Sequence, residues 1–90
     1  MEPVRDNTEK KRFELEVEGH VAFSQYHRVG DKLVMLHTEV PPELGGRGVG
    51  SALVRGALDL ARAQGLKVDA RCPFVRAYLD KHPEYADLRV

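Results

Sequence analysis

Residues 41–53, PPELGGRGVGSAL, decide the fold, because they carry the chain from a predicted strand into a predicted helix. Pro41 and Pro42 cannot continue a central strand, and the glycines that follow them favour a loop. Between Gly48 and Gln64 the apolar residues recur at steps of three and four, which predicts an amphipathic helix. These apolar residues are Val49, Ala52, Leu53, Ala57, Leu60 and Ala63.

Period-two patterns predict three strands before this helix. Apolar residues alternate with glutamates in residues 13–18, residues 21–26 form a second apolar and aromatic run, and residues 32–40 form a third. Gly19-His20 and Gly30-Asp31 separate these runs and favour turns. We therefore expect an antiparallel meander of three strands ahead of the helix.

A fourth strand and a second helix are predicted after the first helix. Residues 66–72 alternate again, and Gly65 suits the C-terminal cap of the first helix. Pro73 is favourable in the first turn of a helix, and His82-Pro83 ends it. A strand, a helix and a strand in succession form a right-handed parallel crossover. The sequence thus predicts an α/β fold, strictly α+β: a mixed sheet of three antiparallel strands, a parallel βαβ crossover and two main helices.

The composition bounds the domain count and the partners. The 90 residues suffice for one small domain, which we place at residues 12–90, behind a polar, flexible leader at residues 1–11. Lys plus Arg and Asp plus Glu each number 14, so the chain lacks the net positive charge that nucleic acids or anionic membranes attract. No apolar stretch approaches the ~20 residues of a membrane span, and we expect a cytoplasmic protein.

Cysteine and histidine usage predicts neither a disulfide nor a metal site. Cys72 is the single cysteine, and the four histidines show no spacing typical of zinc ligands. With neither to supplement the core, the chain must bury its apolar residues efficiently or associate, so we expect a monomer or a homodimer.

Four glycines within residues 45–50 allow the loop to bind an anion. Glycines between a strand and a helix let backbone N–H groups point at a ligand on the helix N-terminus, and phosphate is the natural one. The alternative is a turn that merely allows tight packing. Two common phosphate loops do not match: a P-loop needs Gly-Lys-Ser/Thr where this chain has Gly50-Ser51-Ala52, and a dinucleotide loop follows the first strand of a longer alternating sheet.

The loop resembles the pyrophosphate-binding loop of the GNAT superfamily of N-acetyltransferases. That pattern is Gln/Arg, two residues, Gly, any residue, Gly/Ala, and Gly48-Val49-Gly50 matches its second half. Residues 37–44 before the loop, residues 71–78 (RCPFVRAY) and residues 82–85 (HPEY) are similar to the small, single-domain branch of the superfamily. The resemblance covers residues 13–88, and the family's Gln/Arg falls at Gly45.

This resemblance implies a GNAT-like sheet, acetyl-CoA or CoA as the cofactor, and an amine as the acetyl acceptor. It also implies that the strands on either side of the first helix splay apart and hold the pantetheine arm between them. Cofactor contacts are then expected at the end of the third strand, in the loop, at the start of the first helix and on the second helix. These residues are Val40, Gly45, Gly46, Arg47, Gly48, Val49, Gly50, Ser51 and Tyr78.

Acetyl transfer to an amine needs a base that removes a proton from the nitrogen. His37 and Glu39 are two residues apart, so they lie on one face of a strand just before the loop, and either is a candidate. The competing interpretations are a hydrogen-bonded histidine within the sheet and an exposed carboxylate at the strand end.

Cys72 is the third candidate catalytic residue. It precedes Pro73 and is predicted to cap the second helix, where unpaired N–H groups and the helix dipole stabilise a thiolate. It is either a nucleophile, a group beside the acceptor amine, or buried apolar filler. In many GNAT proteins a tyrosine near Tyr78 protonates the leaving thiolate, and the competing role for Tyr78 is core packing.

The expected function is acetyl-CoA-dependent N-acetylation of an amine that the sequence does not identify. The alternative is a non-catalytic CoA-binding sensor or interaction module of the same fold, supported by the absence of the family's Gln/Arg at Gly45.

Overall fold

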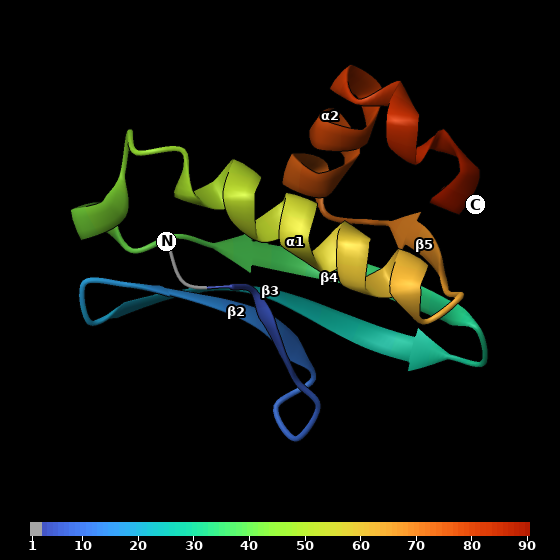
Figure 1. Cartoon of the computed structure of the whole chain (residues 1–90), viewed down its shortest axis with the longest axis horizontal. Helices are drawn as coiled ribbons and strands as arrows, with labels where there is room; N and C mark the ends of the chain where they lie inside the picture. Colours follow the sequence, from blue (N-terminus) through green and yellow to red (C-terminus); the bar gives the residue numbers. More distant parts are fainter. Residues whose placement is uncertain (1–2) are drawn as a thin grey trace.

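A five-stranded sheet in the order β1-β2-β3-β4-β5 carries both helices on one face, as Figure 1 shows for this computed structural model. The structure describes residues 3–90. The strands are β1 (Arg5–Asn7), β2 (Arg12–Val17), β3 (His20–Val29), β4 (Lys32–Glu39) and β5 (Lys67–Ala70). The helices are α1 (Val49–Ala63) and α2 (Pro73–Lys81), and the shorter 3-10 turns are η1 (Pro42–Leu44) and η2 (Pro83–Leu88).

The predicted fold class is confirmed. Strands β2, β3 and β4 pair antiparallel, and β4 pairs in parallel with β5 across the α1 crossover. One apolar cluster lies between the sheet and the two helices, and it includes Leu15, Met35, Leu53 and Val75, each at most 1% exposed. The other face of the sheet carries no helix within residues 3–90, and we call it the open face. Within the same residues no helix is long and apolar enough to span a membrane.

The expectation of a flexible leader at residues 1–11 is wrong for residues 5–7, which form β1. This strand pairs antiparallel with β2, with Arg5 opposite Glu14. Polar contacts hold it, because Glu14 is 3% exposed and accepts hydrogen bonds from Arg5 (2.9 Å) and Asn7 (3.1 Å) of β1. The spacing of apolar residues does not record polar contacts of this kind, so it did not predict β1. Residues 1–2 lie outside the described residues.

We predict that the Glu14 carboxylate makes the stability of the fold depend on pH. Burial alone would raise its pKa, but hydrogen bonds from Arg12, Arg5 and Asn7 outweigh this and lower the pKa from 4.5 to about 2. A lowered pKa stabilises the folded state above pH 4.5, and the stabilisation is lost as the pH falls from 4.5 towards 2. Glu14→Gln should therefore lower the free energy of unfolding at pH 7 by up to about 3 kcal/mol, measured by urea titration.

The matched control is Glu16→Gln, which changes an exposed carboxylate on the same strand. It should leave the free energy of unfolding within about 0.5 kcal/mol of the native value. The difference between the native chain and the Glu14→Gln variant should shrink at pH 3, and equal stabilities at pH 7 would refute the role of Glu14.

A β-bulge in β4 determines which of its side chains point to the helices and which point to the open face. Gln25 of β3 pairs with His37 and Tyr26 pairs with Met35, so Leu36 has no opposite residue. Such a bulge reverses the alternation of side chains along the strand. Met35 before the bulge points to the helices, whereas His37 after it points to the open face and Thr38 points to the helices. A regular strand would have placed His37 in the core.

Candidate active site

The glycine loop presents backbone N–H groups at the start of α1. Gly46 and Gly48 adopt left-handed backbone conformations (φ of 74° and 71°), and Gly48 is the N-cap residue of α1. The Ala52 N–H donates to the Gly48 carbonyl at 3.1 Å, which is the first helical hydrogen bond. The preceding N–H groups of Val49, Gly50 and Ser51 have no acceptor within the helix, and no side chain caps them. They lie at the positive end of the helix dipole, a position that favours an anion.

Phe74 of α2 forms one wall beside this loop. A Cβ atom on Gly50 would lie 2.8 Å from the Phe74 Cζ, so the ring rests against the glycine backbone. Phe74 is 44% exposed, an uncommon exposure for so large an apolar side chain. Sequence reasoning assigned Phe74 only to the second helix. The sequence feature that could have indicated this wall is Gly50, because the absence of a side chain there leaves room for the Phe74 ring.

Neither Gly45, which occupies the position of the family's Gln/Arg, nor Arg47, the arginine of the loop, offers a free cationic side chain to a ligand. Gly45 donates its N–H to the Pro42 carbonyl at 3.0 Å. Arg47 forms an ion pair with Glu18 in the β2–β3 turn, with 2.6 Å between the arginine Nη2 and the carboxylate oxygen. This hydrogen bond and the charge of Arg47 hold the pKa of Glu18 below its usual value. The donors that the loop offers to an anion are therefore backbone N–H groups rather than a guanidinium.

Strands β4 and β5 part at the bulge. Their parallel ladder ends at Met35 opposite Ala70. The N–H groups of Arg71 and Cys72 both donate to the Met35 carbonyl, at 3.0 and 2.8 Å, and the chain then turns into α2. Residues 37–39 pair with β3 on one side, and residues 36–39 have no β5 partner on the other. Their free strand edge leads directly to Val40 and the glycine loop.

His37 and Glu39 lie together on the open face. The His37 Nε2 and a Glu39 carboxylate oxygen are 3.3 Å apart. Both side chains are well exposed, at 58% and 62%, and the His37 ring meets the Phe23 ring edge-on at 6.3 Å. The pair is therefore open to solvent and to an approaching amine.

Cys72 lies on the opposite side of β4 from His37 and Glu39. It is the N-cap residue of α2 and is 3% exposed. Its side chain makes no capping hydrogen bond to the helix, and the thiol donates instead to the Thr38 hydroxyl at 3.5 Å. Thr38 in turn shares a 3.0 Å hydrogen bond with the fully buried Ser24 hydroxyl. The structure thus brings Cys72 to a buried polar cluster, defined as Ser24, Thr38 and Cys72, and separates it from the two candidate bases.

The polar cluster predicts a specific stability loss. Thr38→Val keeps the shape of the side chain but leaves the buried Ser24 hydroxyl without its partner, which costs about 1–3 kcal/mol of unfolding free energy. Thr38→Ser retains the hydroxyl and should lose less. Urea unfolding of the two variants measures the difference. A Thr38→Val variant as stable as Thr38→Ser would show that the hydroxyl contact contributes nothing.

Tyr78 of α2 lines the space between the two helices. Its ring is 8% exposed and stacks on His82 at 3.9 Å between ring centroids. Burial raises the pKa of its hydroxyl, and the nearby Arg55 partly offsets this. The side chain both packs in the core and borders two hollows beside α1.

A helix-N-terminal glycine loop beside two parting parallel strands is the arrangement that the resemblance to the N-acetyltransferases implies. The family model of the GCN5-related N-acetyltransferases matches residues 12–88. Protein NATD1 from mouse is 31% identical over 83 residues, which cover 89% of this chain and 76% of the mouse protein. Protein NATD1 from human is 37% identical over 59 residues, which cover 64% of this chain and 52% of the human protein.

A solved structure agrees with this match. The solution NMR structure of a GCN5-like protein from Staphylococcus aureus is similar with a TM-score of 0.73 and 30% sequence identity, over 97% of this chain and 86% of that one. The chain belongs to the GCN5-related N-acetyltransferase family. The resemblance based on the glycine loop is confirmed.

Proposed function

We propose that this chain is an acetyl-CoA-dependent N-acetyltransferase that acts on an amine. The observation that carries the proposal is the continuous path from the free edge of β4 to the N–H groups at the start of α1, in a member of this family. An elongated ligand with amide groups at one end and a diphosphate at the other fits this path. CoA has that chemistry.

The residues of the chain fit the cofactor through backbone groups. The N–H groups of Val49, Gly50 and Ser51 bind the diphosphate, because they are unpaired and lie at a helix N-terminus. The free edge of residues 36–39 offers strand-like partners to the amides of the pantetheine arm. Val49 contributes only its N–H, since its side chain is 1% exposed and packs in the core.

The open face supplies the base in this proposal. When bound, acetyl-CoA supplies the acetyl group: a carbon–nitrogen bond to the amine forms, the thioester carbon–sulfur bond breaks, and CoA leaves as a thiol. His37 accepts the proton from the amine, and Glu39 orients its ring and stabilises the charge that it gains. In the other assignment, Glu39 itself accepts the proton from the amine.

Cys72 and Tyr78 lie on the face of the sheet that the helices cover, opposite the candidate bases. In this proposal Cys72 lines the pocket for the acetyl group and the amine attacks directly, because the thiol is engaged with Thr38 and lies away from the candidate bases. A nucleophilic Cys72 is the alternative. Tyr78 lies close to the cofactor path and is the candidate donor of a proton to the leaving thiolate.

We predict that Gly48→Val lowers the affinity for CoA at least tenfold, because a β-branched residue cannot hold the left-handed conformation of the loop (φ 71°) without strain of about 1–2 kcal/mol. Gly65→Val is the matched control, since Gly65 has the same φ of 71° at the other end of α1. Isothermal titration should show near-native affinity for the control. Equal affinities of both variants and the native chain would remove the loop from the site.

We predict that alanine at His37 or at Glu39 lowers kcat/KM by about 10²–10⁴-fold while CoA affinity is kept, because a base acts on the amine and not on the phosphates. A thiol-release assay with acetyl-CoA over small amines, polyamines and lysine peptides measures this and identifies the acceptor class. Full activity of both variants would place the base elsewhere.

Cys72 is tested separately by mass spectrometry. Incubation with acetyl-CoA and no acceptor should leave Cys72 unmodified, and Cys72→Ser should keep measurable turnover. An adduct of about 42 Da on the Cys72 peptide, the mass of one acetyl group, would establish the covalent route instead.

A non-catalytic CoA-binding module is the second candidate function. The contacts of Arg47 favour it, since the loop has no Gln/Arg at Gly45 and its one guanidinium is paired with Glu18. CoA binding without thiol release over the whole amine panel would select this alternative. A monomer or homodimer in the cytoplasm is part of both proposals.

A further inference from the structure

Arg55 differs from the other arginines of the chain in its contacts. The sequence has nine arginines, and eight of them donate to a carboxylate or a backbone carbonyl in the structure. Arg55 makes no hydrogen bond or ion pair with any of residues 3–90. Among the described residues, its exposed guanidinium therefore has no partner that would keep it from an anion outside the chain.

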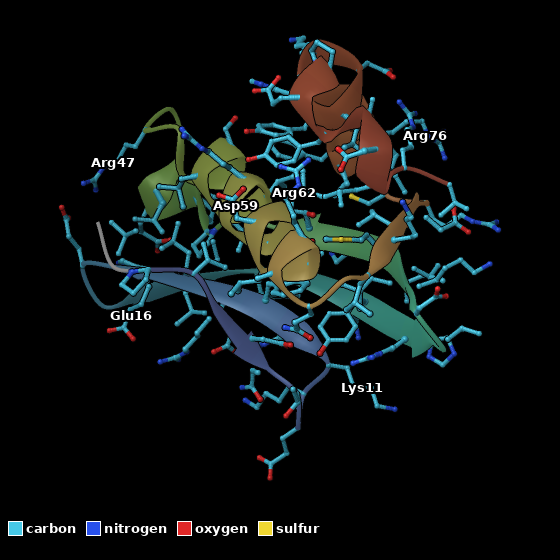
Figure 2. All side chains as sticks on the ribbon, turned by 45° about the vertical axis from the view of Figure 1, so that its right-hand side comes forward. Lys11, Glu16, Arg47, Asp59, Arg62 and Arg76 are labelled. Carbon is cyan, nitrogen blue, oxygen red and sulfur yellow. The ribbon has the colours of Figure 1, made fainter. Side chains whose placement is uncertain are left out.

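Arg55 lines a hollow that begins at the glycine loop. This hollow has a volume of about 670 Å³ and is bordered by Ser51 and Arg55 of α1 and by Tyr78 and His82 of the α2 side. A smaller hollow of about 150 Å³ shares Ser51, Tyr78 and His82 and adds Lys81. In Figure 2 side chains from α1 and α2 face each other across this space, with the labelled Asp59 on α1. The groove thus extends from the unpaired N–H group of Ser51 along the surface of α1.

The groove carries charges of both signs, and Arg55 is its cation on α1. Lys81 adds a second cation from α2. Asp59 is the acidic residue of the groove wall, and its carboxylate already accepts the Tyr85 hydroxyl at 2.7 Å. The carboxylate of Glu84 lies 3.4 Å from His82. Asp59 and Glu84 therefore each have a polar partner, whereas Arg55 makes no hydrogen bond or ion pair within residues 3–90, although its charge helps to lower the pKa of the nearby Glu84 carboxyl.

The spacing along α1 matches a second phosphate of the same ligand. Ser51 and Arg55 are four residues apart, so they lie on one face of the helix about 6 Å apart along its axis. CoA carries a 3′-phosphate on the ribose that adjoins its diphosphate. We propose, on the basis of the proposed function, that Arg55 binds this 3′-phosphate and makes the chain select CoA over 3′-dephospho-CoA. The guanidinium is the side chain best suited to a phosphate, since it binds two oxygens at once.

Isothermal titration with CoA and with 3′-dephospho-CoA tests this role. The native chain should bind CoA about fivefold more tightly, which is the upper end of what a charge pair at an exposed site contributes. Arg55→Gln should lower the affinity for CoA to that for 3′-dephospho-CoA and leave the affinity for 3′-dephospho-CoA unchanged. Arg55→Lys should restore part of the preference. The preference of the native chain should shrink in high salt, because counterions screen exposed charges.

Arg62→Gln is the matched control, because Arg62 is an arginine of the same helix that is already paired with Asp87. This variant should keep the native preference for CoA. Equal affinity of the native chain for both ligands, or an Arg55→Gln variant that weakens both equally, overturns the assignment while the proposed function stands. A native chain that binds neither ligand refutes the proposed function, and the assignment of Arg55 falls with it.

Discussion

The hydrogen bonds to the Met35 carbonyl determine where β4 and β5 separate. Two N–H groups, those of Arg71 and Cys72, converge on this oxygen, so β5 ends there and the chain turns into α2. The bulge at Leu36 lies at the same level of β4 and lets the rest of that strand continue without a β5 partner. The free edge, the placement of Cys72 and the orientation of His37 all follow from this point.

The separation of the strands gives the site two faces with different chemistry. The helix side holds the anion-binding loop, the Tyr78 ring and the polar cluster of Ser24, Thr38 and Cys72. The open face holds the exposed pair of His37 and Glu39. A ligand that enters along the helices can meet an amine on the open face only where β4 lacks β5. In the proposed function, this geometry lets a chain of 90 residues with one sheet bind the cofactor and the acceptor on different sides.

Side-chain periodicity was sufficient to predict three strands, the crossover and both helices, because each of these elements buries an apolar face. It was insufficient for β1, which Glu14 holds through hydrogen bonds from Arg5 and Asn7. The glycine pattern predicted the loop, since positive φ at Gly48 is a backbone requirement that sequence records directly. The bulge at Leu36, the contact of Cys72 with Thr38 and the Phe74 wall depend on register and on packing between distant segments. No local pattern encodes them.

The most direct test of the account is a titration of the ¹⁵N-labelled chain with CoA, followed by the chemical shifts of its amide groups. The account predicts that the largest changes fall on Val49, Gly50 and Ser51 and on residues 36–39, because these backbone groups bind the diphosphate and the pantetheine amides. Shifts confined to other segments, such as the hollow beside Tyr26 at the far end of the sheet, with the loop unchanged, would contradict it.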